Sequence, residues 1–123
     1  MKRLALIAVS FAGILGLSGF ASAGTILGGP GTVERLVLLE ADGAMRIGFN
    51  GPTPNPAGCD VTAGFALQLN APGRSAEETR TILNNLQLAF MTRRPVSLYI
   101  RDDICYTIEG FPMRVVSGII VTN

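Results

Sequence analysis

The sequence predicts an all-β domain with a single helix, rolled into a small barrel. Five runs of alternating apolar residues and one amphipathic helix occur in the order β-β-β-α-β-β. The first run is apolar on both parities, as expected for a strand that is buried on both faces or long and bent between two neighbours. A lone helix between the third and fourth strands is the order of the OB-fold. We therefore predict an OB-fold-like, five-stranded Greek-key barrel, whose closure leaves no exposed edges.

The first 23 residues predict a cleaved signal peptide. Lys2 and Arg3 precede an apolar run that ends near Leu17, and the small-residue triplet Ala-Ser-Ala follows at 21–23. The apolar run is shorter than the roughly 20 residues that a membrane span needs. We therefore expect an exported protein, periplasmic or secreted, whose mature chain is one domain at 24–123 and has no membrane span.

The charge of the mature chain argues against nucleic acid as a partner. Without Lys2 and Arg3, the ten basic residues fall to eight, all arginine, against nine acidic residues. The net charge is then near −1. Polyanions are bound through many Lys or Arg contacts to phosphate, which such a chain lacks.

Cys59 and Cys105 are the two cysteines of the chain. An exported protein most simply pairs them, because its compartment is oxidising. Closing a loop of about 47 residues would stabilise the fold by roughly 4 kcal/mol. Two free thiols and an intermolecular bridge are the alternatives.

The N-terminal half of the domain predicts a loose, glycine-rich leading segment at 24–31 and then two strands. The run at 32–40 is rich in β-branched and aliphatic residues and predicts the first strand. "ADG" at 41–43 is an Asp-Gly hairpin signal, and strict alternation follows it at 44–50. These runs predict a hairpin.

The Pro/Gly-rich segment at 51–58 cannot continue a strand and predicts a rigid surface loop ending at Cys59. A third strand follows at 64–70. The helix is predicted from Ser75, where Ser75 and Glu78 form a capping box, to Arg94, before Pro95. Its apolar stripe consists of Ile82, Leu83, Leu86, Ala89 and Phe90.

The C-terminal part predicts two more strands. The segment at 96–101 alternates, with Tyr99 and Arg101 outward, and predicts the fourth strand. Residues 102–112 predict a polar loop that holds Cys105, and 113–123 the last strand, with a bulge or bend at Gly118. A Cys59–Cys105 bridge would then tie two loops together across the helix.

The residue types present argue against an enzyme. The mature chain has no His and no Lys, and with its cysteines paired it lacks the common general bases and nucleophiles. Asp102 and Asp103 are adjacent and suit a turn better than a glycosidase pair, which needs carboxyls about 5–10 Å apart across a cleft. These two carboxylates and Glu109 do not have the spacing of a calcium-binding loop. We expect no catalytic residues, cofactor or metal; a carboxylate-dependent hydrolase is the weaker alternative.

Binding residues are easier to place. Tyr99 and Arg101 share the outward face of the fourth strand, with Tyr106 nearby, and rings beside Arg are typical of sugar recognition. The plain alternative is that Tyr99 covers the barrel and Arg101 pairs with an acid. Leu88 and Met91 lie off the core stripe and predict an oligomer interface or pore lining, unless loops bury them.

Four stretches resemble one family of small exported proteobacterial proteins: "GTVERL", "NPAGC", "LNNLQLAFMTRRPVSLYI" and "FPMRVVSGIIV". These proteins are similar to the pentamer-forming B subunits of one-A-five-B toxins, the subtilase cytotoxin type especially. The resemblance covers about 31–121. It implies an OB-fold with one disulfide and no catalysis and, in the toxin members, a glycan-binding surface and assembly into a ring.

We therefore expect an exported, non-catalytic binding module whose partner is a cell-surface glycan or protein. We expect it to form a homo-oligomer, for example a pentamer. The alternative is a periplasmic inhibitor or structural envelope protein that binds a protein partner through its loops.

Overall fold

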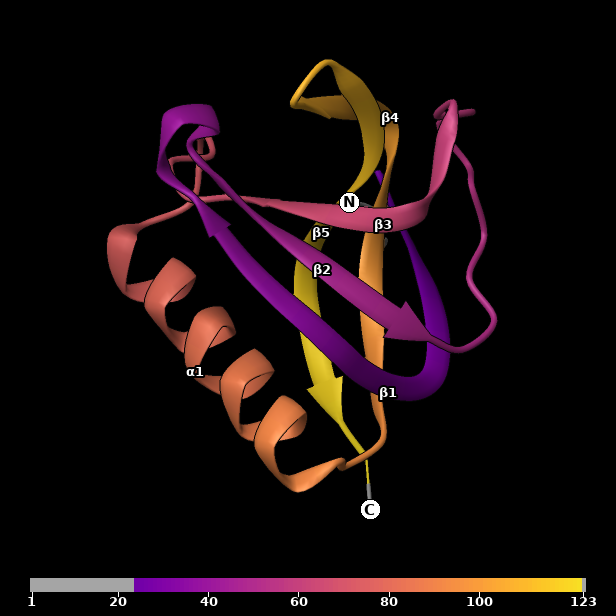
Figure 1. Ribbon diagram of the computed structural model, residues 1–123, viewed down its shortest axis with the longest axis vertical. Coiled ribbons are helices and arrows are strands. Elements are labelled where there is room, and N and C mark those ends of the chain that lie inside the picture. The colour runs from indigo at the N-terminus through magenta and orange to yellow at the C-terminus, as the bar shows by residue number, and fades with distance from the viewer. Residues whose placement is uncertain (1–23, 123) are drawn as a thin grey trace, which may run out of the picture.

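Residues 24–122 are the part of the chain that the computed structural model describes, and they form a closed five-stranded barrel with one α-helix (Figure 1). Around the barrel the strands follow the order β1-β2-β3-β5-β4. β3 runs parallel to β5, and the other neighbours are antiparallel. The elements are β1 (Thr25–Leu39), a 3-10 turn η1 (Glu40–Asp42), β2 (Ala44–Asn50), β3 (Val61–Gln68), α1 (Ala76–Thr92), β4 (Val96–Ile108) and β5 (Phe111–Val121). The predicted OB-fold-like barrel and its element order are confirmed. The predicted signal peptide at 1–23 lies outside the described residues.

β1 is longer than predicted because it serves two neighbours in turn. Residues 25–31 pair with β4, and residues 32–39 pair with β2. The expectation of a loose segment at 24–31 is therefore wrong, since β4 supplies hydrogen-bond partners to this glycine-rich stretch. Gly28 permits close packing here: a Cβ at this position would lie 3.0 Å from Thr53 Cγ2 and 3.1 Å from Ile100 Cδ1.

A β-bulge at Glu34 explains why the first run is apolar on both parities. The register shifts between Val33, which pairs with Phe49, and Arg35, which pairs with Gly48. The extra residue reverses the parity locally, so that Val33 is buried and Leu36, an even position, also packs against the core, whereas Leu38 further along is 53% exposed.

α1 begins and packs largely as its sequence predicts. The Ser75 hydroxyl accepts a hydrogen bond from the Glu78 N–H (3.1 Å), and Glu78 Oε1 accepts one from the Ser75 N–H (2.9 Å), which is a capping box. The helix packs against β1 and β5 and buries Thr79, Ile82, Leu86 and Ala89. Phe90 was expected in this buried stripe, but it is 39% exposed, because it lies at the edge of the stripe in the last turn of the helix.

β4 and β5 form a longer hairpin than predicted. β4 continues to Ile108, and Glu109-Gly110 connects it to Phe111. The expected loop at 102–112 is wrong. Ile104, Tyr106 and Ile108 alternate with polar residues, and this arm packs its apolar side on a second small core cluster. The buried members of that cluster are Ala44, Ala66, Ile108 and Met113.

The predicted disulfide between Cys59 and Cys105 is present. Cys59 lies in the segment between β2 and β3, as expected, but Cys105 lies within β4 rather than in a loop. The bridge therefore fastens the end of the 51–60 segment to a strand of the barrel.

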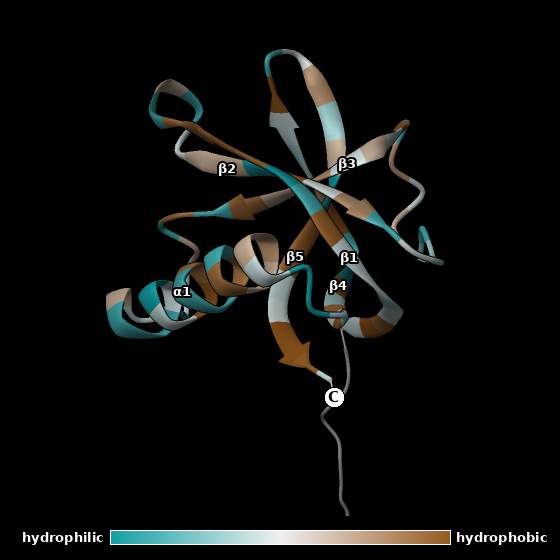
Figure 2. Ribbon diagram, turned by 60° about the horizontal axis from the view of Figure 1, so that its bottom comes forward, coloured by the Kyte–Doolittle hydropathy of each residue, from teal (hydrophilic) through white to brown (hydrophobic). Residues whose placement is uncertain are grey.

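The main core fills the barrel beneath α1, and hydrophilic and hydrophobic residues follow one another along the strands (Figure 2). The inward residues of β4 alternate as predicted. The fully buried members of this core include Val33, Ile47, Leu67, Leu86, Val96, Leu98, Ile100 and Val116.

Candidate functional site

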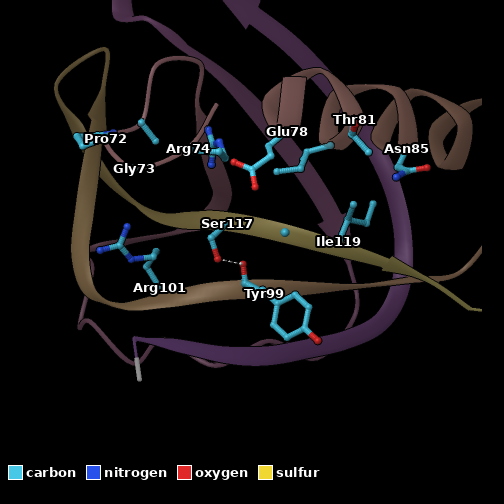
Figure 3. A pocket seen from close by; sticks show the side chains of 13 residues that line it. Pro72, Gly73, Arg74, Glu78, Thr81, Asn85, Tyr99, Arg101, Ser117 and Ile119 are labelled. Carbon is cyan, nitrogen blue, oxygen red and sulfur yellow. Dashed lines mark hydrogen bonds between the residues drawn. The ribbon is translucent and has the colours of Figure 1, made fainter. Parts of the chain in front are cut away.

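A cavity of about 540 Å³ opens between the start of α1 and the β4–β5 pair (Figure 3). This volume lies within the range of small-molecule sites. Residues at the start of α1 form one wall and residues of β4 and β5 form the other. The side chains that matter for its chemistry are Arg74, Glu78, Asn85, Tyr99, Arg101 and Ser117.

On the helix side, Arg74 and Glu78 are held in place by local hydrogen bonds. Arg74 Nε donates to Thr79 Oγ1 (2.9 Å), and its Nη2 donates to the carbonyl of Gln68 at the end of β3. Glu78 is anchored by the capping box at Ser75. The helix start thus presents one guanidinium and one carboxylate in fixed positions.

On the strand side, a bulge in β5 shapes the wall. Tyr99 pairs with Gly118 and Ile100 pairs with Val116, so that Ser117 is the extra residue. This confirms the predicted bulge at Gly118. The Ser117 hydroxyl donates to the Tyr99 carbonyl (3.5 Å), as Figure 3 shows. A Cβ on Gly118 would lie 3.1 Å from Tyr99 Cδ2, so glycine makes room for the ring.

Arg101 forms a bidentate ion pair with Asp103. The Nε–Oδ1 distance is 2.9 Å and the Nη2–Oδ2 distance is 2.7 Å. The hydrogen-bonded carboxylate raises the pKa of Arg101, and the guanidinium in turn lowers the pKa of Asp103. Asp102 and Asp103 lie within β4 rather than in the predicted turn. Asp103 is therefore an exposed counter-ion of Arg101 in this structure.

The charge of Arg101 acts on Arg74 across the cavity. Burial lowers the pKa of Arg74; Glu78 opposes that effect, whereas the positive charge of Arg101 adds to it. The walls therefore include guanidinium donors, a carboxylate acceptor and an aromatic ring. Such a mixture can orient a polar ligand by hydrogen bonds while the ring covers one of its apolar faces.

Tyr99 and Arg101, predicted as ligand-binding residues, both line this cavity, but Tyr106 does not. The Tyr106 hydroxyl donates to the Asp42 carbonyl (2.5 Å) and so ties the outer arm of β4 to η1. The alternative roles expected for Tyr99 and Arg101 also hold in part. Tyr99 lies over Gly118 on the barrel surface, and Arg101 pairs with Asp103.

Leu88 and Met91 lie on the side of α1 that faces away from the barrel, and they are 50% and 78% exposed. Their burial against loops, the alternative to an interface, is wrong. No group of acidic and cysteine side chains within 24–122 is arranged to hold a metal ion. None of the helices described there has the length and apolar character needed to cross a bilayer.

Sequence reasoning missed the helix side of the cavity. Glu78, Thr81 and Asn85 recur at three- and four-residue spacing, which places them along one side of α1. This polar edge beside the apolar stripe was the available signal. Arg74 precedes the helix and gave no signal of its own.

Comparison with protein-family models and with curated proteins found no match.

Proposed function

We propose that the protein is an exported, non-catalytic binding module that takes a glycan in the cavity between α1 and the β4–β5 bulge. The observation that carries this proposal is that Tyr99, Arg101 and Arg74 line one open cavity. An aromatic ring beside planar, multidentate donors suits a sugar, whose ring has an apolar face and whose edges carry hydroxyls.

Two further features support the proposal. OB-folds commonly serve as binding scaffolds, and oligosaccharides are among their ligands. The leader-like pattern at 1–23 favours a location where surface glycans occur. The resemblance of 31–121 to toxin B subunits implies the same kind of ligand.

Glycan-array binding by the mature chain tests the proposal. We expect binding to one glycan class, lost in Tyr99→Ala and in Arg101→Ala. Arg80→Ala is the matched control for the arginine, because Arg80 is exposed on α1 and does not line the cavity. Tyr106→Phe alters the other tyrosine of the chain and should keep binding. Absence of binding across a broad array would count against the proposal.

Self-association is a second candidate property, favoured by Leu88 and Met91. Both side chains are apolar, exposed and one turn apart on α1. A homo-oligomer, such as the pentamer that the toxin resemblance implies, would bury them.

Native mass spectrometry separates the two forms of the proposal. An oligomer that dissociates in Leu88→Gln with Met91→Gln, but not in Gln87→Ala, supports assembly through this face. A monomer favours the alternative of a periplasmic inhibitor or envelope protein that docks a protein partner. In that case the exposed Phe111 at the tip of the β4–β5 hairpin is the first residue to test.

A further inference from the structure

A second hollow, of about 410 Å³, lies over the outer face of β1, β2 and β3. It is separate from the cavity beside α1 and shares no lining residue with it. Its charged lining residues are Glu34 and Arg35 at the β1 bulge and Arg46 on β2. Figure 1 shows β1 and β2 crossing the front of the barrel beside each other.

Arg35 and Arg46 are neighbours on this face. Arg35 pairs across the sheet with Gly48, and Arg46 lies two residues from Gly48 on the same side of β2. Such diagonal neighbours lie about 7–8 Å apart at the backbone, within reach of one another's long side chains. Within 24–122, neither arginine forms an ion pair or a side-chain hydrogen bond.

Glycines keep the space beneath the two arginines open. A Cβ on Gly64 of β3 would lie 3.4 Å from Arg46 Nε, and a Cβ on Gly48 would lie 3.0 Å from Arg35 Cβ. Glycine within a strand weakens the sheet, and it often marks a place where a ligand approaches the backbone. Neither Gly48 nor Gly64 has a positive φ, so backbone conformation does not require glycine here.

We propose that Arg35 and Arg46 together bind one phosphate or sulfate group, carried by a small ligand or free in solution. Two unpaired guanidiniums on one face repel each other, and an oxyanion between them would remove that repulsion. Guanidinium is also the group best matched to the tetrahedral oxygens of such an anion.

Glu34 and the overall charge limit the size of the ligand. Glu34 also lines the hollow, so with Arg35 and Arg46 this surface carries a net charge of about one positive unit. The nine carboxylates of 24–123 outnumber its eight arginines. A long polyanion needs many cationic contacts, and this chain does not supply them. A single oxyanion group needs only two cationic contacts, which Arg35 and Arg46 supply.

An NMR titration of the isotope-labelled mature chain tests this site with three probes: inorganic phosphate, inorganic sulfate and glucose 6-phosphate. We expect saturable shifts at the Gly48 and Gly64 amides and at the Nε–H groups of Arg35 and Arg46. Tighter binding of glucose 6-phosphate than of inorganic phosphate would identify an ester ligand, and equal binding a free anion; both support the site. Shifts that do not saturate, or that lie elsewhere on the molecule, would overturn it.

Charge-matched variants complete the test. Arg35→Gln and Arg46→Gln should each weaken binding by about tenfold or more, the loss of a charge-assisted hydrogen bond. Arg80→Gln makes the same charge change on α1 and should leave affinity unchanged. Gly48→Ala keeps every charge but places a methyl group about 3.0 Å from Arg35 Cβ, and we expect it to weaken binding too. Equal losses in Arg80→Gln and Arg46→Gln would show a general charge effect and contradict a built site.

Discussion

The guanidinium carbon of Arg114 lies 4.0 Å from the centroid of the Phe65 ring, and the two residues are register partners on the parallel strands β5 and β3. Arg114 is only 4% exposed, and it forms no ion pair within 24–122. Its Nη1 donates to Thr53 Oγ1 (2.7 Å) and to the Pro54 carbonyl (3.1 Å). Burial lowers the pKa of this guanidinium.

The 51–60 segment is therefore fastened from both sides. Within the segment Arg114 donates to the Thr53 hydroxyl and the Pro54 carbonyl, and its Nη2 donates to the Thr62 carbonyl (2.5 Å) just beyond it. The Cys59–Cys105 disulfide holds the C-terminal end of the segment. Cys105 is also the register partner of Arg114, so both attachments lie side by side on the β4–β5 pair. The buried Arg114 guanidinium thus supplies hydrogen bonds to a loop that forms few backbone hydrogen bonds.

Arg114→Met should destabilise the fold by about 2–4 kcal/mol, because it removes the donors to the half-buried Thr53 hydroxyl and Pro54 carbonyl and to the Thr62 carbonyl. Methionine keeps the length of the side chain and its contact with the Phe65 ring, so the loss reports mainly on the hydrogen bonds. Urea unfolding followed by circular dichroism measures the change. Arg80→Met on the exposed side of α1 is the control and should stay within about 0.5 kcal/mol of the parent. If Arg114→Met lowered the free energy of unfolding no more than Arg80→Met does, this role of Arg114 would be contradicted.

Cys59→Ser with Cys105→Ser should lower the free energy of unfolding by about 4 kcal/mol, because the open loop gives the unfolded chain more freedom. Reduction of the parent protein should have the same effect. Reductant added to the double serine variant should change nothing, which is the internal control. Coincident urea curves for the parent with and without reductant would rule out a stabilising bridge.

Glu109→Asn should stabilise the β4–β5 hairpin by about 0.5–1 kcal/mol. Glu109 and Gly110 both have positive φ, 53° and 85°, as a two-residue type I′ turn requires. Asparagine accepts this conformation more readily than glutamate does. Glu109→Ala keeps a Cβ without the polar side chain and should bring no gain. Thermal unfolding that ranks alanine equal to asparagine would show that turn conformation is not the cause.

The Arg101–Asp103 ion pair predicts a defined pH response. Because the guanidinium lowers the pKa of Asp103, the pair is complete above the ordinary aspartate value near 3.9 and is lost as the pH falls through the lower, folded-state value. Carbon-detected NMR of the Asp103 carboxyl measures its midpoint, which should rise in Arg101→Gln. Arg80→Gln should leave it in place. An unchanged midpoint in Arg101→Gln would mean that the pair does not persist in solution.

The strand order was predictable because alternation is strong wherever one side of a strand is buried. The prediction of individual strand bounds failed where pairing with a distant strand outweighs the local preference of the residues. Gly28 and its glycine neighbours look like a loop, yet β4 supplies their partners, and the missing side chains let Thr53 and Ile100 approach. The parity of Ile104, Tyr106 and Ile108 was a readable strand signal, obscured by the polar residues between them.

The candidate site was predictable only on its strand side. Tyr99 and Arg101 share a parity on one strand, so their common face follows from the sequence. Arg74 and Glu78 join them only because α1 packs over the end of the barrel; the polar edge of α1 marks a candidate surface, but no local pattern shows which strands it faces. Tyr106 is the opposite case. Its closeness in sequence to Tyr99 predicted a shared site, but its hydroxyl donates to the Asp42 carbonyl of η1 instead.

Mapping the amide shifts of residues 24–123 on titration with the best glycan from the array tests the central proposal most directly. We predict that the shifts concentrate at Gly73, Arg74, Ser117 and Gly118, around the cavity, and that they vanish in Tyr99→Ala. Shifts centred instead on the hairpin tip at Phe111, or unchanged in Tyr99→Ala, would contradict a ligand site between α1 and the β4–β5 bulge.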